Sequence, residues 1–373
     1  MHIAFLNSWP SDPARGSGTA VGISGLAAGL EGLGHRVTHL RPRRRWAGLG
    51  LTPARLLYNA GLGARIRDGA RLRDGARPRD GARPRDGGFD LVAGFDIDGC
   101  FFRPAPGQAY AVCLKGISAE EMRFETGGPR ARLWLLSRLE GRNARRAGRV
   151  IVPSEYCRRA AQAAYRLAPE RVRVVPEGID LSLWAADGPP LRQGAGPVIL
   201  SVARQYPRKN TKTLLEAMVT VRAATPGVRL RIVGGGPMLP ELRARAARLG
   251  LEGEVAFLGE LAGDEEVRRE YRRADLFCLP SRQEGFGIVF LEAMAAGLPI
   301  VAADAAAVPE VAPAGEVSLL VPPLDAGALA EALLRLLGDE DLRARLGAAG
   351  RVRVRRYAWP EVARAFLAAA GAP

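Results

Sequence analysis

The sequence predicts an α/β protein made of two domains, each a parallel β-sheet with helices on both faces. Short, continuously apolar runs alternate with Ala-, Leu- and Arg-rich stretches of helical period, which is typical of parallel strands buried on both sides. The length of 373 residues exceeds the size at which a single hydrophobic core stops growing. Near 180–197, Gly and Pro recur without apolar periodicity, which indicates an interdomain linker.

The strands follow from the apolar runs, taken in chain order. They are predicted at 2–6, 89–93, 109–114, 150–152 and 172–175 in the first half, and at 198–203, 228–233, 254–258, 276–279, 299–303 and 318–321 in the second. Periodic stretches between them predict helices, among them 211–223, 238–249 and 326–337. Strands that alternate with helices in this way favour parallel pairing.

Basic residues outnumber acidic residues, and the excess is concentrated in the first half of the chain. The formal net charge is +15, from 54 Lys and Arg against 39 Asp and Glu. Residues 1–187 hold 30 basic and 18 acidic residues, whereas residues 188–373 hold 24 and 21. Only Lys115, Lys209 and Lys212 among the basic residues are lysines. A non-catalytic protein that binds nucleic acid or another polyanion is one reading of such a charge.

Part of this charge lies in a repeat. Residues 65–88 are four tandem hexapeptides of the form R-x-R-D-G-A/G, with eight Arg and four Asp. They offer almost no apolar surface, and Pro78 and Pro84 interrupt any helix, so we predict a solvated loop insertion without a catalytic role. The segment from Arg41 to Tyr58 mixes cations with Trp and Leu. We interpret it as a strand end and a core-facing helix, with contact to anionic lipid or a phosphorylated acceptor as the alternative.

Composition disfavours several function classes. The four cysteines are scattered without a C-x-x-C pair and only three histidines occur, so neither a zinc site nor a disulfide framework is predicted. Neither a signal peptide nor a membrane span is recognised, and we expect a cytoplasmic protein. The triplet Asp96-Ile97-Asp98 imitates a D-x-D metal site, but it lies in the other domain from the candidate phosphate site, and a metal role is disfavoured.

The strongest chemical signal is the string PSRQEGFGIVFLEAMAAGLP at 280–299. A predicted strand runs into a glycine-bracketed turn, and a helix that ends at a Gly and a Pro follows. Gly285 and Gly287 allow a ligand to approach the backbone, and the free N–H groups of the helix start favour a phosphate. Glu284 and Glu292 would be about 12 Å apart along a helix, so they would hold two ends of an extended ligand.

These residues resemble the E-x7-E motif of retaining glycosyltransferases of the group 1, or family 4, type. Segments that resemble the same family occur along nearly the whole chain, at Ser8–Ala20, Gly34–Val37, Val150–Ser154, Val175–Asp180, Ser201–Lys209, Val233–Pro237 and Phe257–Gly259. The resemblance implies the GT-B fold, in which two Rossmann-like domains face each other across a cleft that holds the active site. We expect domains at 1–185 and 186–356, with the C-terminal helix 357–373 joined to the first.

The resemblance also assigns roles to residues. Arg204 and Lys209 would hold the donor diphosphate together with the helix start near Gly287, so neither a metal nor another cofactor is expected. Glu284 would contact the donor sugar near its reacting face, and Glu292 the ribose hydroxyls. The other donor-binding candidates are Gly18, Lys115, Gly259, Gly285, Phe286, Gly287 and Ile288. The family often has a His at the position of Lys115, and often two glycines where this chain has Ala at 306–307.

The sequence therefore predicts a retaining, metal-independent glycosyltransferase that moves a sugar from a nucleotide-sugar donor to a glycan, lipid or small-molecule acceptor. One alternative is a nucleotide-sugar epimerase of the same architecture. The other is the non-catalytic basic protein that binds anions or nucleic acid. The main hypothesis expects no nucleic-acid partner, and it allows peripheral contact between the first domain and the anionic inner face of a membrane.

Overall fold

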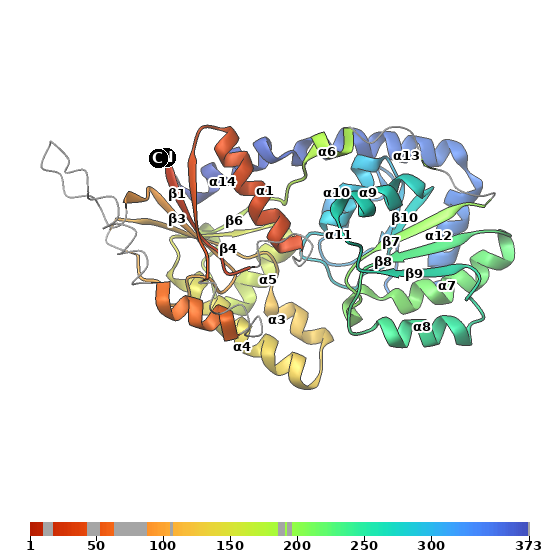
Figure 1. Cartoon of the computed structure of the whole chain (residues 1–373), viewed down its shortest axis with the longest axis horizontal. Helices are drawn as coiled ribbons and strands as arrows, with labels where there is room; N and C mark the ends of the chain where they lie inside the picture. Colours follow the sequence, from red (N-terminus) through yellow and green to blue (C-terminus); the bar gives the residue numbers. More distant parts are fainter. Residues whose placement is uncertain are drawn as a thin grey trace, which may run out of the picture. The chain divides into compact units, whose positions relative to one another are not determined.

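The computed structural model describes residues 1–9, 18–42, 53–62, 88–104, 107–185, 191 and 196–371. The chain divides into two compact units, shown in Figure 1: unit 1 is Met1–Pro176 with Trp359–Pro373, and unit 2 is Glu177–Ala358. Residues 65–87 of the predicted repeat and residues 43–52 of the basic segment lie outside the described residues. The predicted fold class, α/β with two parallel sheets, is confirmed.

Unit 1 contains a six-stranded parallel sheet in the order β2-β1-β3-β4-β5-β6. The strands are β1 (His2–Leu6), β2 (Arg36–Leu40), β3 (Leu91–Phe95), β4 (Ala109–Cys113), β5 (Arg149–Val152) and β6 (Val172–Val174). The apolar pattern does not predict β2, because this edge strand has no fully buried residue. The other strands lie within two residues of their predicted positions, since burial on both faces makes them continuously apolar.

Alternate residues of these strands enter two separate apolar layers. Leu6, Val92 and Val112 pack on one face, against residues of the helix at 53–62, α4 (Gly127–Arg146) and α5 (Glu155–Tyr165). Phe5 and Phe95 pack on the opposite face, against α1 (Gly18–Gly32) and α14 (Trp359–Ala370). The short helix α3 (Ser118–Glu121) follows β4.

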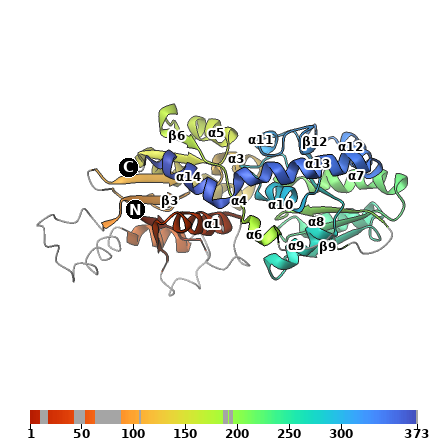
Figure 2. The same cartoon turned by 90° about the horizontal axis from the view of Figure 1, so that it is seen from above.

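Helix α14 comes from the far end of the sequence and is packed tightly against α1. A Cβ atom at Gly25 would lie 2.0 Å from Cε2 of Trp359, and one at Gly29 would lie 2.8 Å from the Trp359 carbonyl oxygen. Only glycine therefore fits at these two positions of α1. Figure 2 shows the two helices in the same layer of unit 1.

Unit 2 contains a second six-stranded parallel sheet in the order β12-β11-β10-β7-β8-β9. Its strands are β7 (Val198–Val202), β8 (Arg229–Val233), β9 (Val255–Gly259), β10 (Leu276–Leu279), β11 (Ile300–Ala303) and β12 (Ser318–Val321). The helices that contribute to the layer on one face are α9 (Asp264–Arg273), α10 (Ile288–Ala296) and α11 (Val308–Val311). Those that contribute to the layer on the other face are α7 (Thr211–Ala224), α8 (Leu239–Arg248), α12 (Ala326–Gly338) and α13 (Glu340–Arg353).

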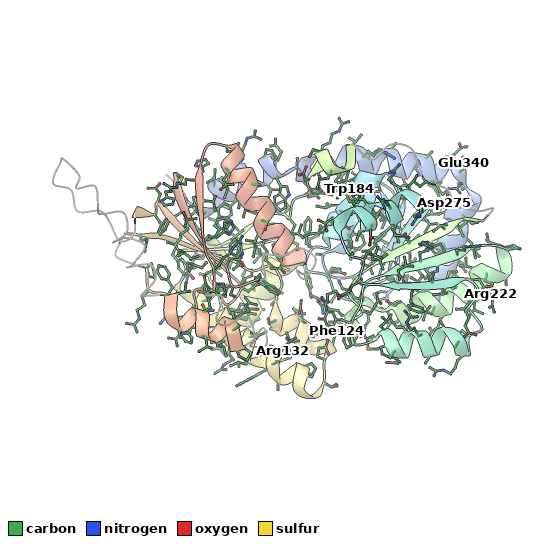
Figure 3. All side chains as sticks on the ribbon, viewed as in Figure 1. Phe124, Arg132, Trp184, Arg222, Asp275 and Glu340 are labelled. Carbon is green, nitrogen blue, oxygen red and sulfur yellow. The ribbon has the colours of Figure 1, made fainter. Side chains whose placement is uncertain are left out.

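The division between the units falls at Pro176, earlier than the expected boundary at residue 185. Ile179 is tied to unit 2 because its N–H donates to the carbonyl of Tyr357 at 2.9 Å. Trp184, on α6 (Leu181–Ala185), packs edge-to-face on Tyr271 with the ring centroids 5.3 Å apart, and it is labelled in Figure 3. The first turns after Pro176 are therefore held by the core of unit 2. Within the part of the chain that the structure describes, no helix is both long and apolar enough to cross a membrane.

Candidate active site

The residues predicted to bind the donor diphosphate and sugar lie in unit 2, in the loops that follow β7 and β10. These strands are neighbours, and the chain continues from β7 toward β8 on one side and from β10 toward β11 on the other. Loops diverge at such a switch point of a parallel sheet, which makes it the preferred ligand site of open α/β folds. The two loops are joined here, because the Arg282 N–H donates to the Arg208 carbonyl at 2.8 Å. The Asn210 side-chain amide donates to the Pro280 carbonyl at 3.2 Å.

Lys209 and Glu284 meet directly at this point. Lys209 ends the short helix η6 (Pro207–Lys209), and its Nζ donates to Oε1 of Glu284 at 2.6 Å. The side chains are only 14% and 8% exposed. An ammonium group has three N–H donors, of which this carboxylate uses one, so the lysine retains the capacity to bind phosphate oxygens. The structure thus brings together two of the three predicted catalytic residues.

The start of α10 has the geometry expected of a phosphate-binding helix. Gly287 precedes the first turn with φ at 92°, a left-handed conformation that favours glycine. A Cβ there would also lie 2.6 Å from the ring of Phe290. No side chain caps this helix start, so its first N–H groups remain available to an anion. Ile288 is the first residue of the helix and is partly buried against the unit 2 core.

Phe286 was predicted to bind the donor, but its side chain is packed in the core. It is 5% exposed and packs edge-to-face on Tyr357, with the ring centroids 5.7 Å apart. Any donor contact of this residue would therefore use its main chain. The side chain instead anchors the loop that carries Glu284, at the point where α10 begins.

Glu292 lies on the second turn of α10, where it accepts a hydrogen bond from the Tyr271 hydroxyl at 2.7 Å. Burial of the carboxyl group raises the pKa of Glu292 to about 7, and the negative charge of Asp264 acts in the same direction. The hydrogen bond from Tyr271 and the charge of Arg268 act in the opposite direction. The residue as a whole is partly exposed, although its carboxyl group is buried against Tyr271.

Arg204, the third predicted catalytic residue, is not part of the Lys209–Glu284 pair. Its Nη1 lies 3.4 Å from Oε1 of Glu260, and both side chains are about half exposed. The main chain beneath Arg204 is fixed by the glycine loop at 234–236. A Cβ at Gly234 would lie 2.1 Å from the Ala203 carbonyl oxygen, and the Gln205 N–H donates to the Gly235 carbonyl at 2.8 Å. The guanidinium group is therefore exposed to solvent, whereas the main chain that carries it is fixed.

The remaining predicted donor contacts are distributed over both units. Gly259 ends β9 with φ at 69°, and its carbonyl accepts the Gly234 N–H at 2.7 Å, so it joins the same set of loops in unit 2. Gly285 lies between Glu284 and Phe286 in the β10–α10 loop. Gly18 and Lys115 belong to unit 1, where Gly18 begins α1 and Lys115 follows β4. The structure therefore groups the predicted donor-binding residues of unit 2, whereas Gly18 and Lys115 belong to the other compact unit.

Sequence reasoning missed two polar groups beside this site. Tyr271 is fully buried and orients Glu292, yet it lies on α9 at a position that reads as an ordinary core aromatic. Gln283 is 2% exposed, and neither its Oε1 nor its Nε2 has a hydrogen-bond partner among the described residues. Burial of an amide without hydrogen-bond partners lowers the free energy of unfolding, so other contacts of the loop must offset this loss. No sequence signal distinguishes such a glutamine from a solvated one.

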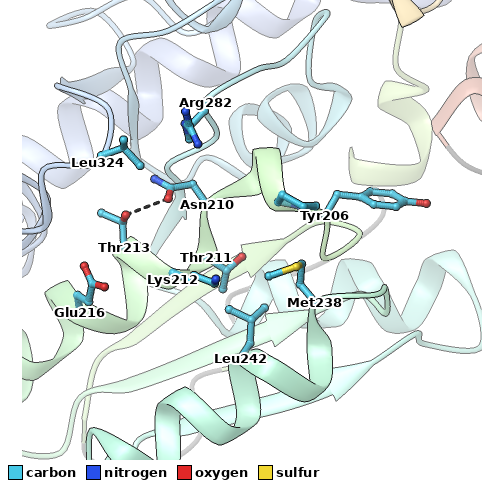
Figure 4. Close-up of a pocket in the computed structure, with 11 residues that line it drawn as sticks. Tyr206, Asn210, Thr211, Lys212, Thr213, Glu216, Met238, Leu242, Arg282 and Leu324 are labelled. Carbon is cyan, nitrogen blue, oxygen red and sulfur yellow. Dashed lines mark hydrogen bonds between the residues drawn. The ribbon is translucent and has the colours of Figure 1, made fainter. Parts of the chain in front are cut away.

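A cavity of about 400 Å³ lies next to these loops, at the start of α7, and is drawn in Figure 4. Polar groups line part of it, including Asn210, which accepts a hydrogen bond from the Thr213 hydroxyl at 2.9 Å. Lys212 projects into the same region and is paired with Glu241. Lys209 and Glu284 do not line this cavity, which is therefore distinct from the candidate donor site.

Solved structures similar to this chain define its fold class. Sucrose-phosphate synthase from Thermosynechococcus elongatus superimposes with a TM-score of 0.76 at 22% identity, over 98% of this chain and 97% of that one. Anabaena HepE in complex with UDP and glucose superimposes with a TM-score of 0.70 at 19% identity, over 100% and 99%. These similarities show the GT-B fold.

The family follows from the sequence comparisons. The model of "Glycosyl transferases group 1" matches residues 187–353, and that of "Glycosyltransferase Family 4" matches residues 118–183. The chain therefore belongs to the glycosyltransferases of the group 1, or family 4, type, and the predicted resemblance is confirmed.

Two curated relatives are similar to this chain over slightly more than half of its length. A GDP-mannose-dependent alpha-(1-6)-phosphatidylinositol monomannoside mannosyltransferase of Mycobacterium tuberculosis H37Rv is 34% identical over 216 residues, 54% of this chain and 56% of that protein. A phosphatidyl-myo-inositol mannosyltransferase of Mycobacterium leprae is 40% identical over 219 residues, 58% of this chain and 56% of that protein. The chain thus spans little more than half the length of these relatives in the alignments.

Proposed function

We propose that this protein is a retaining, metal-independent hexosyltransferase that moves a sugar from a nucleotide-diphosphate donor to an acceptor hydroxyl. The observation that carries the proposal is the 2.6 Å contact between Lys209 and Glu284 beside the uncapped start of α10. It places a cation, an anion-binding helix end and a buried carboxylate within one pair of loops. Family membership supports the reaction class, and the E-x7-E resemblance supports retention of configuration.

In the proposed reaction, the bond between the anomeric carbon and the diphosphate oxygen breaks while the acceptor oxygen bonds to that carbon. Negative charge develops on the leaving diphosphate, and the proton of the acceptor hydroxyl passes to it. Lys209 and the N–H groups at the start of α10 would stabilise that charge. Arg204 would exchange its exposed contact with Glu260 for a phosphate oxygen. With these cationic and dipolar groups, the mechanism requires no metal.

The two carboxylates would hold other parts of the donor. Glu284 is already fixed by Lys209 and would accept hydroxyl hydrogen bonds from the donor sugar. Glu292 would accept hydrogen bonds from the ribose, with its carboxylate oriented by Tyr271. Glu284 lies before α10 and Glu292 lies within it, so the two carboxylates would hold separate parts of an extended nucleotide sugar.

The test is a donor panel that includes GDP-mannose and UDP-glucose, with release of the nucleotide and the configuration of the sugar followed by NMR. We expect nucleotide release that depends on an added acceptor, with retention at the anomeric carbon, in the presence of a chelator. The variant Lys209→Ala should lose turnover, whereas Lys212→Ala, which removes a lysine three positions away, should not. Conversion of the donor into an epimer without any acceptor would instead establish the epimerase alternative. Salt-sensitive DNA binding that is unaffected by Glu284→Gln, without turnover, would establish the binding protein.

We further propose peripheral contact between unit 1 and an anionic membrane at the inner face, which would suit a lipid-linked acceptor. Helix α4 exposes Trp134 and Leu135 at 55% and 38%, and the guanidinium of Arg138 lies 5.6 Å from the Trp134 ring centroid. Arg132 on the same helix is exposed and is labelled in Figure 3. Aromatic and cationic side chains together suit a negatively charged lipid surface. Sedimentation with phosphatidylglycerol vesicles should fall in Arg138→Glu and should be absent with phosphatidylcholine vesicles.

A further inference from the structure

An arginine cluster, made of Arg103, Arg142 and Arg146, lies in unit 1 where α4 meets the loop between β3 and β4. Arg142 donates its Nε–H to the Cys100 carbonyl at 3.1 Å. Arg146 donates from Nη1 to the same carbonyl at 3.2 Å and to the Phe102 carbonyl at 3.5 Å. Arg103 directly follows Phe102 and is exposed. The buried loop residues thus hold two guanidinium groups next to each other, with a third arginine beside them.

The positive charges of the cluster repel one another. Arg142 and Arg146 are four residues apart on α4, and like charges at this spacing destabilise a helix. Burial lowers the pKa of Arg146, and the positive charges of Arg142 and Arg103 lower it further. Folding therefore brings together three cations that would separate in the unfolded chain, and other interactions must offset the loss of stability.

No carboxylate balances the cluster within the part of the chain that the structure describes. None of the three arginines forms an ion pair with a described acidic residue. Glu140 is the one acidic residue of α4, but it is 4% exposed and accepts hydrogen bonds from Ser118 and Tyr165. Asp98, on the loop after β3, is fully buried and lies 3.6 Å from Arg55. An anion from solution is therefore the counter-charge that remains.

The cluster also has hydrogen-bond donors to offer such an anion. A guanidinium group carries five N–H donors. Within the described chain Arg142 uses one of them, Arg146 uses its Nη1, and Arg103 uses none. Most N–H groups of the cluster therefore face no acceptor from the described residues, and they can bind the oxygens of a ligand.

The geometry of the donors selects the class of anion. A planar guanidinium group can bind two oxygens of one phosphate at once, and a phosphate has further oxygens for a second and a third arginine. A carboxylate has only two oxygens, so it would satisfy fewer of these donors. Phe101 is 42% exposed, and its ring centroid lies 5.5 Å from the guanidinium carbon of Arg142. This exposed ring suits the organic group that carries a phosphate.

We propose that Arg103, Arg142 and Arg146 form a binding site for a phosphate group, carried by an anionic lipid headgroup or by a soluble phosphate ester. Arg142 and Arg146 bind the phosphate oxygens from α4, and Arg103 binds them from the loop. Phe101 contacts the organic part of the ligand. The site rests neither on the proposed glycosyl transfer nor on the proposed membrane contact, because its argument uses none of their residues.

Titration of the full chain with inorganic phosphate at constant ionic strength tests the site, with the arginine Nε–H groups followed by NMR. The Nε–H of Arg142 is hydrogen-bonded, and its signal is identified by its loss in Arg142→Gln. We expect a saturable shift of this signal. Arg103→Gln should weaken phosphate binding by about 10- to 100-fold, the effect of one hydrogen bond to a charged group. Because Arg103 is exposed and makes no hydrogen bond to the described residues, this variant should fold.

Arg145→Gln is the matched control. It removes a positive charge from the same turn of α4, but Arg145 donates to the Tyr165 carbonyl of α5 at 3.3 Å. It should bind phosphate as the wild type does. A shift of the Arg142 signal that does not saturate, or equal phosphate affinity in Arg103→Gln and Arg145→Gln, would overturn the inference.

Thermal unfolding at low ionic strength without phosphate gives a second readout, which a merely structural arginine would not produce. Arg103→Gln should unfold at a higher temperature than the wild type, because it removes a repelling charge that salt no longer screens. Added phosphate should then raise the unfolding temperature of the wild type more than that of the variant. A lower unfolding temperature of Arg103→Gln without phosphate would contradict the repulsion on which the site depends.

Vesicle binding separates the two sources of the phosphate. If the ligand is a lipid headgroup, Arg103→Gln should sediment with phosphatidylglycerol vesicles less than Arg145→Gln does. If it is a soluble ester, the two variants should sediment equally, and glycerol 3-phosphate should shift the Arg142 signal at least as strongly as inorganic phosphate does. Either result, together with the weakened phosphate binding of Arg103→Gln, sustains the site and assigns its ligand.

Discussion

A double-mutant cycle at Lys209 and Glu284 separates the structural role of this pair from its catalytic role. Two unit charges 2.6 Å apart attract by about 6 kcal/mol at an effective dielectric constant of about 20. Desolvation of the two groups offsets most of this, because the side chains are only 14% and 8% exposed. We therefore expect a coupling free energy of about 2 kcal/mol, within the range measured for contacting residues.

The prediction concerns Lys209→Met, Glu284→Gln and the double variant. Each single variant leaves a buried partner without its counter-charge, and we expect a loss of about 2 kcal/mol in the free energy of unfolding. That corresponds to a decrease of roughly 4–8 °C in Tm for a unit of this size. In the double variant both charges are gone, so stability should recover toward the wild-type value.

Activity should behave differently from stability in the same variants. Lys209 and Glu284 are each proposed to contact the donor, so all three variants should lose at least about 100-fold in kcat/KM for nucleotide release. Thermal unfolding and nucleotide release are measured on the same preparations, with Lys212→Met as the control because its pair with Glu241 is about half exposed. Turnover that recovers together with stability in the double variant would refute the catalytic assignment. Additive losses of stability would refute the energetic reasoning.

Three further predictions concern the same pair of loops. Glu292→Gln should gain stability relative to the wild type as pH rises from about 4.5 to 7, by up to about 3 kcal/mol. The reason is that Glu292 in the folded wild type keeps its proton up to a pKa of about 7, whereas in the unfolded chain it ionises near 4.5. Tm of both proteins is measured at pH 4 and pH 8, and a Tm difference that does not change with pH would contradict the prediction. Gly287→Ala should cost about 1–3 kcal/mol, because its φ is 92° and its Cβ would meet the Phe290 ring, whereas Gly253→Ala, with nothing within 4 Å, should cost little by thermal unfolding. Gln283→Leu should raise the free energy of unfolding by about 1 kcal/mol, since it removes a buried amide without partners, and a lower Tm would show that the amide has a partner in solution.

Much of the fold was predictable because burial on both faces of a parallel sheet leaves a simple signature. Strand β10, at Leu276–Leu279, is apolar at each position and is found where the apolar run predicts it. Strand β2 at the edge of unit 1 contains Arg36 and His39 and no fully buried residue, so its apolar run is broken. Edge strands are the elements for which hydrophobic pattern carries the least information.

The candidate site was predictable only in part. Glu284, Lys209 and the start of α10 are encoded in contiguous strings whose glycines have a backbone reason that can be recognised from the sequence. The resemblance names Phe286 as a donor contact, but a sequence motif does not determine which side chain of the turn faces the core, and this ring packs on Tyr357. Tyr271 contacts Glu292 because α9 packs on α10, and no local sequence pattern predicts a contact between two separate helices.

The packing of α14 on α1 has a consequence for the order in which the chain acquires its structure during synthesis. The apolar layer on one face of the unit 1 sheet is completed by residues of α14, including Trp359 and Phe366. Gly25 and Gly29 leave the space that Trp359 occupies. Translation delivers these residues only after all of unit 2 has left the ribosome. Unit 2 can therefore fold as a contiguous segment while one face of the unit 1 sheet still lacks its covering helix α14. Unit 1 is thus the first unit to be synthesised and the last to complete its core. Its uncovered sheet face is most exposed to chaperones or to aggregation between the synthesis of β1 and the docking of α14.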